Sequence, residues 1–106
     1  MAIADTTNAS YDVVIHQNAL SELHSLPTNI RQEFREIAHQ AAKLKKPSNH
    51  PNIRLLRHSN NMMRIRVDYY RAICDLSIPE FRVLLIDHRE YVYQSIEEAK
   101  ARQSDD

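Results

Sequence analysis

The chain has 106 residues, with 14 Lys and Arg against 14 Asp and Glu, one cysteine and no glycine. This length fits a single compact domain. The absence of glycine excludes P-loops, dinucleotide-binding turns and glycine-flanked nucleophile turns, because each needs backbone room that only glycine provides. The charge is uneven, since residues 43–93 hold ten basic and five acidic residues and both flanking segments are acidic. The local field of the middle segment therefore favours an anionic partner despite the neutral total.

The N-terminal half is predicted to contain one strand followed by two helices. Residues 11–15 are rich in β-branched and aromatic side chains, which favours a strand. Asn18 is expected to cap a short helix that ends before Pro27. A second helix is expected to begin near Thr28 and to end before Pro47. Its apolar residues recur at steps of three and four positions: Ile30, Phe34, Ile37, Ala38, Ala41 and Leu44.

The C-terminal half is predicted to consist mainly of strands. Residues 53–57 form a short strand, and in residues 63–67 apolar side chains alternate with Arg64 and Arg66, which predicts one buried face. Residues 70–76 follow closely enough to form a hairpin with that strand. Residues 81–86 are apolar on both faces, as in a strand inside a sheet. Residues 95–102 are expected to form a last helix or a mobile segment.

These elements predict an α+β fold, in which two N-terminal helices pack on a largely antiparallel sheet of four to five strands. One domain is expected to span residues 1–106, with residues 1–10 and 103–106 flexible. Residues 1–10 lack the features of a secretory signal, and no apolar run approaches the ~20 residues that cross a bilayer. We therefore expect a cytoplasmic protein with no membrane partner.

Neither a metal site nor a cysteine nucleophile is favoured by the sequence. The six histidines lack the spacing of helical metal ligands, and Cys74 has no second cysteine to share a metal with. Cys74 lies in the middle of a predicted strand, on the same side as Ala72 and Leu76, so we expect a buried, unreactive thiol. No metal and no cofactor are predicted.

The arginines of the predicted sheet are the strongest functional signal. If the strands are neighbours, four guanidinium groups converge on one patch: Arg64, Arg66, Arg71 and Arg89. Residues able to stack on bases border that patch: His88, Tyr91 and Tyr93. A single guanidinium group can donate hydrogen bonds to two oxygens of one phosphate, so the patch is a candidate RNA site. The alternative is a solvated sheet surface, where arginines keep an exposed strand soluble.

Two segments carry a resemblance to a known family. Residues 63–73, MRIRVDYYRAI, resemble the strand pair of the RelE/ParE toxin superfamily. Residues 85–93, LIDHREYVY, resemble the ending of that family, in which His-Arg precedes Val-Tyr. The two helices upstream also match the arrangement and length of the family. The resemblance covers most of the chain and implies a microbial-RNase-like fold.

The resemblance implies the toxin of a type II toxin–antitoxin pair. RelE-like members cut mRNA in the ribosomal A site without metal, which makes the ribosome, mRNA and a cognate antitoxin the expected partners. Matching the motifs residue by residue gives the expected catalytic residues: Arg71, Arg89, Tyr93 and His88. The expected RNA- or phosphate-binding residues are Arg64, Arg66, Arg57 and Lys45. His88 is the candidate acid or base, because imidazole is the side chain best suited to proton transfer near neutral pH.

Two alternatives remain open from the sequence. The first is a ParE-like protein that inhibits DNA gyrase without catalysis, and the second is an attenuated or inactive member that only binds an antitoxin. Asp68 and Asp87 stand where the family has glycine, and each is expected to put a carboxylate near the arginine patch.

We expect the antitoxin to dock on Leu20, Leu23 or the sheet edge near Ile53.

Overall fold

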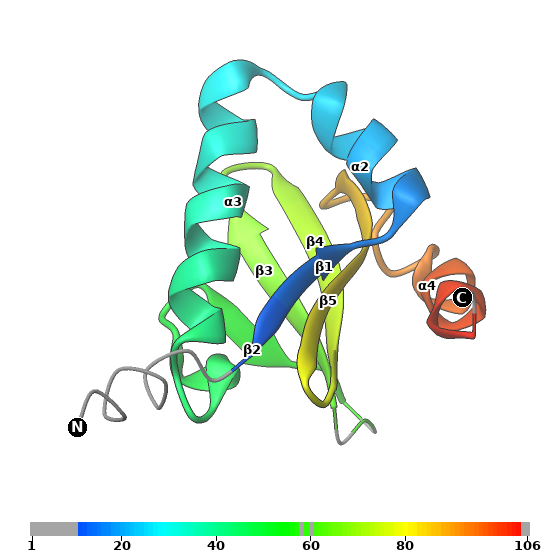
Figure 1. Cartoon of the computed structure of the whole chain (residues 1–106). Coiled ribbons are helices and arrows are strands. Elements are labelled where there is room, and N and C mark those ends of the chain that lie inside the picture. The colour runs from blue at the N-terminus through cyan, green and yellow to red at the C-terminus, as the bar shows by residue number, and fades with distance from the viewer. Residues whose placement is uncertain (1–10, 58, 60, 105–106) are drawn as a thin grey trace.

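The computed structural model describes residues 11–57, 59 and 61–104 (Figure 1). The predicted flexibility of residues 1–10 and 105–106 lies outside the described residues. The helices are α2 (Gln17–His24), α3 (Thr28–Ala42), the short 3₁₀ helix η1 (Pro47–Asn49) and α4 (Ile96–Gln103). The strands are β1 (Asp12–Ile15), β2 (Ile53–Leu55), β3 (Met62–Val67), β4 (Tyr70–Ser77) and β5 (Glu80–His88).

The five strands form one sheet in the order β1-β5-β4-β3-β2. β1 pairs with β5 in parallel, and the other neighbours are antiparallel. The predicted α+β fold with a largely antiparallel sheet is therefore confirmed. The interior position predicted for residues 81–86 is also confirmed, because β5 lies between β1 and β4.

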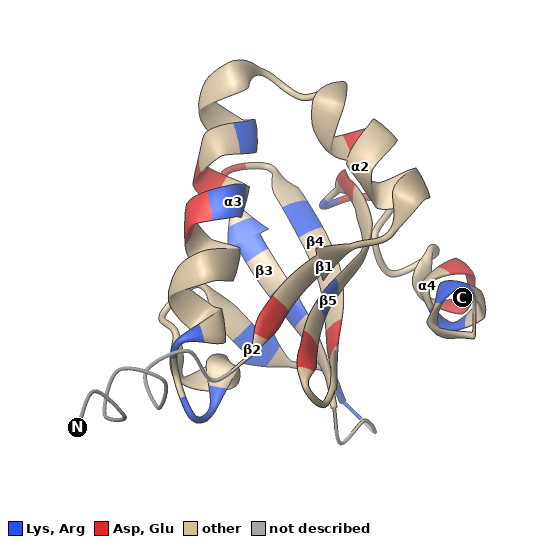
Figure 2. Cartoon of the chain, in the orientation of Figure 1, with Lys and Arg blue, Asp and Glu red and all other residues tan. Residues whose placement is uncertain are grey.

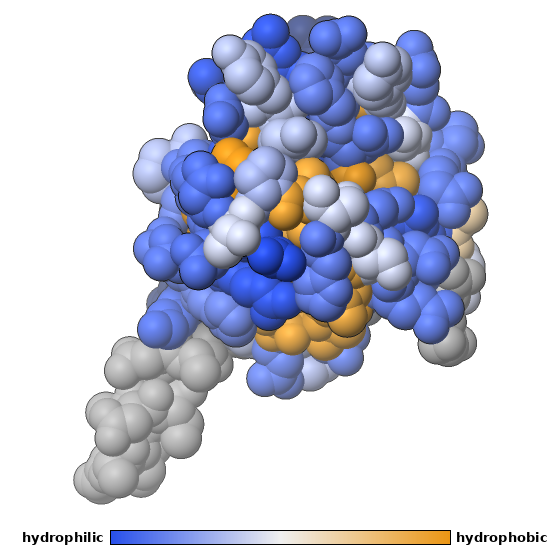
Figure 3. All heavy atoms as spheres, turned by 90° about the horizontal axis from the view of Figure 1, so that it is seen from above, coloured by the Kyte–Doolittle hydropathy of each residue, from blue (hydrophilic) through white to orange (hydrophobic). Residues whose placement is uncertain are grey.

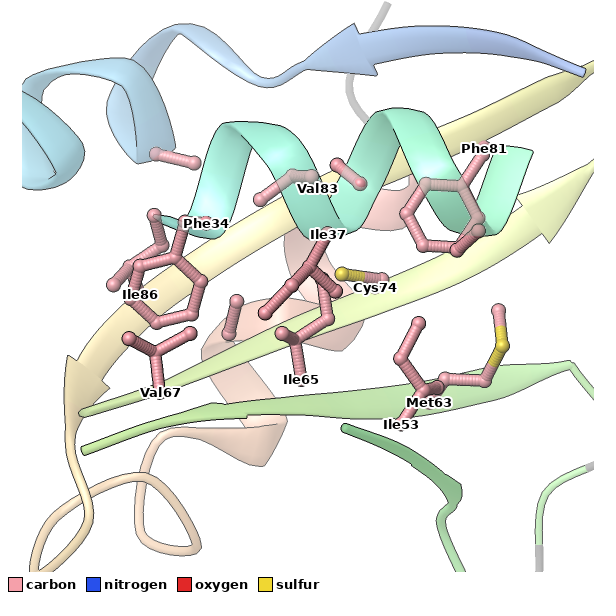
Figure 4. Close-up of a cluster of buried hydrophobic side chains, with 14 of the residues drawn as sticks. Phe34, Ile37, Ile53, Met63, Ile65, Val67, Cys74, Phe81, Val83 and Ile86 are labelled. Atoms are coloured by element: carbon pink, nitrogen blue, oxygen red, sulfur yellow. The ribbon is translucent and has the colours of Figure 1, made fainter. Parts of the chain in front are cut away.

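One face of the sheet packs against α2 and α3 (Figure 1). The buried stripe of α3 includes Phe34 and Ile37, which meet Ile65 of β3 and Val83 of β5 in the core (Figure 4). Cys74 lies fully buried in the same cluster, as its position in the strand pattern predicts.

The helix ends differ from two details of the sequence prediction. The N-cap of α2 is His16, whose ring Nδ1 accepts a hydrogen bond from the Asn18 backbone N–H at 3.1 Å, so the expected cap at Asn18 is wrong. The α3 helix ends at Ala42, two residues before Leu44, whose side chain is exposed. The helix therefore ends before Pro47 can block it.

The turn between β3 and β4 contains the positive-φ residue Asp68, with φ of 54°. A short polar side chain tolerates this left-handed conformation better than most residues do. Asp68 thus occupies the kind of backbone position for which glycine is usually chosen, in a chain without glycine.

The C-terminal helix α4 is held to the sheet by polar contacts. The Asp75 carboxylate, 1% exposed, accepts two hydrogen bonds from Arg82 at 2.8 and 2.6 Å and one from the Gln103 side chain at 2.9 Å. Gln103, within the segment predicted to be flexible, is the last residue of α4, and its side chain donates to Asp75. Sequence patterns do not reveal a partner 28 residues away.

The face shown in Figure 3, at the end where α2 and α3 meet, is mostly polar, with apolar side chains visible in places. Among the residues expected to dock an antitoxin, Leu23 and Ile53 are buried in the core, so their side chains do not form an exposed surface. Leu20 is 36% exposed. No helix in the described part of the chain is long and apolar enough to cross a membrane.

Candidate functional site

The face of the sheet turned away from α3 carries a group of arginines. Met63, Ile65 and Val67 of β3 point into the core with α3, so the alternating side chains of this strand point to the opposite face. Strand register places the arginines of β2, β3 and β4 next to one another, as the blue segments of these strands show in Figure 2. We call this group the arginine face: Arg54, Arg64, Arg66 and Arg71.

Register pairs these arginines directly across the strands. Arg54 is opposite Arg64, and Arg66 is opposite Arg71. Like charges that face each other repel, and such pairs destabilise a sheet. A face of this composition is therefore suited to bind an anion that offsets the repulsion.

Arg71 is half-buried and folds back over the turn before it. Its Nη1 donates to the backbone carbonyls of Asp68 at 2.9 Å and Tyr70 at 2.8 Å. These two hydrogen bonds fix the side chain at the start of β4. The left-handed turn at Asp68 thus positions one of the acceptors that orient Arg71.

The environment of Arg71 lowers its pKa. Burial is the largest cause, and the charges of nearby arginines add to it, whereas Tyr93 acts in the opposite direction. The contributing arginines are Arg64, Arg66 and Arg89. Four of the predicted site residues therefore surround Arg71 closely enough to perturb its ionisation.

Arg64 connects the arginine face to Tyr93. Its Nη1 donates a hydrogen bond to the Tyr93 hydroxyl, while the buried Nε of Arg64 has no hydrogen-bond partner among the described residues. The Tyr93 side chain is 56% exposed. A buried guanidinium N–H without an acceptor is costly, so this position favours a ligand with an acceptor oxygen.

Arg89 lies beside the β3–β4 turn. Its backbone N–H donates to the Tyr69 carbonyl at 2.8 Å, and its guanidinium carbon lies 5.0 Å from the centre of the Tyr69 ring. This cation–π contact holds the charge at the end of the sheet nearest to Arg71. Arg89 therefore borders the arginine face.

His88 belongs to a different surface. It is opposite Tyr70 in the register, and Tyr70 packs against the core on the α3 side, whereas Arg71 and its partner Asp87 are on the other face. The His88 ring lies 5.7 Å from the Tyr70 ring and 6.3 Å from the Tyr69 ring. Strand alternation therefore separates His88 from the arginine face with which the sequence grouped it.

The hydrogen bonding of His88 also bears on its chemistry. Its Nδ1 accepts a hydrogen bond from the Glu90 backbone N–H at 3.2 Å, so in the neutral ring the proton is on Nε2. This form of the ring presents the Nε2–H as a hydrogen-bond donor, and its Nδ1 lone pair faces the Glu90 backbone N–H.

The carboxylate of Asp87 is used within the chain. It accepts hydrogen bonds from the His88 backbone N–H at 2.8 Å and from the Ser95 hydroxyl at 3.2 Å. Asp87 is opposite Arg71 in the register, which confirms that a carboxylate lies close to the patch. These contacts hold the loop that carries Tyr93 between β5 and α4.

Arg57 and Lys45 are separated by the structure. Arg57 lines a cleft of about 660 Å³ together with Arg64, Tyr93 and Lys100 of α4. Lys45 follows α3, the helix that covers the opposite face of the sheet, and the Tyr11 hydroxyl donates to its backbone carbonyl at 2.9 Å. The structure thus adds Arg57 to the site region and does not bring Lys45 there.

Sequence reasoning missed Arg54 and Lys100. The alternation of residues 53–55 carries a signal for Arg54, because its neighbours in a paired strand point into the core and to its edge. The position of Lys100 depends on how α4 folds back, which no local pattern reveals. Within the part of the chain that the structure describes, no three His, Cys, Asp or Glu side chains gather into a metal site.

The architecture is that of an α+β protein, with a two-helix layer on one face of a mainly antiparallel sheet and the arginine face on the other. No protein-family model and no curated protein matches the chain. Solved structures do match. The free state of a mutant E. coli toxin RelE has a TM-score of 0.71 at 18% identity, over 88% of this chain and 97% of that one.

Two toxin–antitoxin complexes match as well. The RelB-RelE complex from Methanococcus jannaschii gives a TM-score of 0.64 at 18% identity, over 76% of this chain and 95% of that one. The RelBE2 toxin–antitoxin complex from Mycobacterium tuberculosis gives a TM-score of 0.60 at 24% identity, over 76% of this chain and 93% of that one. The chain therefore has the fold of RelE toxins, as the resemblance of its two motifs implies.

Proposed function

We propose that this protein is the toxin of a type II toxin–antitoxin pair and that it cuts mRNA on the ribosome without a metal ion. The observation that carries the proposal is Arg71, placed among three other guanidinium groups and beside Tyr93. The fold shared with RelE toxins supports the same conclusion. A cytoplasmic protein is implied, because translating ribosomes are its target.

The proposed reaction is attack of a ribose 2′-oxygen on the adjacent phosphorus. The P–O2′ bond forms as the P–O5′ bond breaks, the 2′-hydroxyl proton passes to solvent water, and the leaving 5′-oxygen takes a proton from the Tyr93 hydroxyl. Charge builds up on the phosphorane oxygens, and prearranged cations stabilise it. Arg71 is fixed by two hydrogen bonds to carbonyls and would contact the reacting phosphate. Arg64 and Arg66 on the neighbouring strand would hold the phosphates on either side.

Tyr93 is the group best placed to exchange a proton with the RNA. Its hydroxyl oxygen accepts from Arg64, so its own O–H remains available as a donor. Arg71 has a lowered pKa, which makes its guanidinium a better proton donor than an ordinary arginine. His88 lies on the other face of its strand from Arg71, so the proposed proton transfer does not use it.

The antitoxin would act by neutralising the arginine face. Two of the matched structures are complexes with the antitoxin RelB, which supports a partner of this kind. An antitoxin segment with acidic side chains would satisfy the same guanidinium groups that bind phosphate. The exposed side chain of Leu20 on α2 is a further expected contact.

Primer-extension mapping of mRNA in a reconstituted translation system tests the proposal. We expect new cuts at A-site codons with the wild-type chain and a loss of about 100-fold or more in rate for Arg71→Ala. Tyr93→Phe keeps the ring and removes the hydroxyl, so it tests proton exchange without removing stacking. Arg35→Ala, on the exposed side of α3, is the matched control and should cut normally.

If folded, antitoxin-free protein produces no cuts, the proposed nuclease activity is overturned. A DNA gyrase supercoiling assay with the same sample then tests the ParE-like alternative. Inhibition of gyrase by both the wild type and Tyr93→Phe would establish that alternative.

A further inference from the structure

The cleft beside the arginine face lies between β2 and α4. It has a volume of about 660 Å³, within the range of small-ligand sites. We call it the β2–α4 cleft, and its lining side chains belong to two chemical kinds. Four are cations: Arg54, Arg57, Arg64 and Lys100. The others that bear on the inference are apolar or aromatic: Leu55, Leu56, Ile96 and Tyr93.

The cations of the cleft are available for a ligand. Among the described residues, the ion pair of Lys100 is a surface pair with Glu97, at 3.5 Å, with both side chains well exposed. Such pairs contribute little and exchange easily. The Nε of Arg64 is buried without a hydrogen-bond partner among the described residues. An anion in the cleft would therefore meet donors that are not already committed to strong internal acceptors.

The apolar wall selects the type of anion. Leu55 is 48% exposed at the mouth of the cleft, and Ile96 faces it from the start of α4. A free phosphate or a carboxylate would leave this wall in water. A nucleotide uses both parts of the cleft, because its phosphate binds the cations while its base covers the apolar wall.

Arg64 and Tyr93 line the cleft and also belong to the region around Arg71. A strand whose phosphate lies at Arg71 can therefore continue past Tyr93 into the cleft without leaving the positive surface. This continuity favours a nucleotide of the same strand over a separate acidic peptide.

We infer that the β2–α4 cleft binds one nucleotide of the RNA strand adjacent to the phosphate at Arg71. Arg57 and Lys100 hold its phosphate, and Leu55 contacts its base. This inference rests on the proposed function, since it assigns the neighbouring part of the same substrate.

Fluorescence anisotropy with 2′-O-methyl oligonucleotides, which cannot be cut by 2′-oxygen attack, tests the inference. The series lengthens one nucleotide at a time at either end. For the wild type we expect one added nucleotide to raise affinity sharply at one end. For Arg57→Gln and Lys100→Gln we expect that gain to fall by about fivefold for each lost contact. Lys46→Gln, on the loop after α3, is the matched control and should bind as the wild type does.

The salt dependence gives a second readout. For single strands, the slope of log K against log salt should decrease by about 0.7 for each phosphate contact removed. We therefore expect a smaller slope for Arg57→Gln and Lys100→Gln and an unchanged slope for Lys46→Gln. A general loss of fold would also remove the circular-dichroism signal, which the exposed positions of these substitutions should preserve.

Base contact is tested by a double comparison. An abasic nucleotide at the added position should weaken binding to the wild type but have little effect on Leu55→Ala, because that variant already lacks the apolar contact. Leu55 is exposed enough for this substitution to leave the core intact.

Three outcomes overturn the inference. If the wild type binds oligonucleotides and the cleft variants bind them with the same affinity and slope, the cleft takes no nucleotide, while the nuclease proposal stands. If the wild type binds none of the series, the inference also fails, and primer extension decides separately on cleavage. If a polyglutamate peptide competes in the wild type and loses affinity in the cleft variants while RNA does not, the cleft is a peptide site.

Discussion

Arg102 of α4 donates to both carboxylate oxygens of Glu22 in α2, at 3.0 and 2.9 Å, although 80 residues separate them in the sequence. The Arg102 side chain is only 9% exposed and also donates to the Leu84 carbonyl at 2.9 Å. Hydrogen bonding to Glu22 is the largest cause that raises the pKa of Arg102. This pair fastens the last helix to the first across the end of the sheet.

We expect Glu22→Gln to destabilise the protein by about 1–3 kcal/mol, because it leaves a mostly buried guanidinium without its charged partner. Equilibrium urea unfolding measures this loss. Glu98→Gln is the control: Glu98 accepts from the same Arg102 at 3.2 Å but is well exposed, so its loss should cost less than about 0.5 kcal/mol. Equal effects of the two substitutions would contradict the prediction.

The left-handed turn at Asp68 predicts a ranking of substitutions. Glycine suits a φ of 54°, whereas alanine has a Cβ that clashes there, so Asp68→Gly should be about 1 kcal/mol more stable than Asp68→Ala. Asp68→Asn should resemble the wild type, since asparagine also tolerates this conformation. Thermal unfolding of the three variants checks the order. An alanine variant as stable as the glycine variant would show that the turn relaxes.

Burial keeps the Cys74 thiol neutral in the fold, so its effect on stability depends on pH only in the alkaline range. Desolvation is the main cause that raises its pKa, with the charge of Asp75 adding to it. In the unfolded chain the Cys74 thiol ionises at a lower pH than in the fold. The contribution of the neutral thiol to the free energy of unfolding is therefore complete below about pH 9. Above that pH it declines by at most about 1.4 kcal/mol per pH unit.

Comparison with Cys74→Ala isolates this contribution. The difference in free energy of unfolding between wild type and variant should change with pH only above about pH 9. A thiol reagent at neutral pH should modify unfolded but not folded protein. Rapid modification of the folded wild type would contradict the burial of Cys74.

The lowered pKa of His50 predicts a loss of stability at acid pH. Its Nδ1 accepts from the Asn52 backbone N–H at 3.1 Å, and its Nε2 lies 2.7 Å from the Gln40 side-chain oxygen. Burial lowers the pKa of His50, so the neutral ring is favoured in the fold. Its stabilising contribution is therefore present above pH 6.5 and is lost as the pH falls below that value.

His50→Gln should remove this part of the acid sensitivity. Urea unfolding of wild type and variant between pH 5 and pH 8 should give a difference that shrinks toward low pH. An acid slope unchanged by His50→Gln would contradict the lowering of the His50 pKa by burial.

Local patterns in the sequence are sufficient to predict α2, α3 and the five strands, whereas η1 is not predicted and residues 95–102 are left open as a helix or a mobile segment. The three- and four-residue spacing of α3 and the alternation of β3 each reflect one buried face, and burial is what a periodic pattern records. The place of α4 was beyond such patterns, because it depends on ion pairs and hydrogen bonds between distant residues, such as Gln103 with Asp75. The cap at His16 was missed because histidine is an uncommon N-cap residue.

The sequence predicts the candidate site correctly where the alternation of side chains along a strand decides which face of the sheet each residue lies on. Arg64 and Arg66 share a face with Arg71 because their strands pair in register. Neighbours in sequence, by contrast, point to opposite faces, so grouping His88 with Arg89 by adjacency placed the imidazole on the wrong side. Lys45 has a suitable charge, but the charge of a loop residue carries no information about which face of the sheet it lies near.

The short length of β1 has a consequence for how the protein behaves at high concentration. β1 pairs with residues 80–83 of β5 and leaves the rest of that nine-residue strand uncovered by a neighbour on that side. Glu22 accepts the Ile86 N–H at 2.9 Å in this uncovered stretch. A strand from another molecule could extend the sheet there only after displacing a charged side chain, so this edge resists intermolecular β-pairing and aggregation.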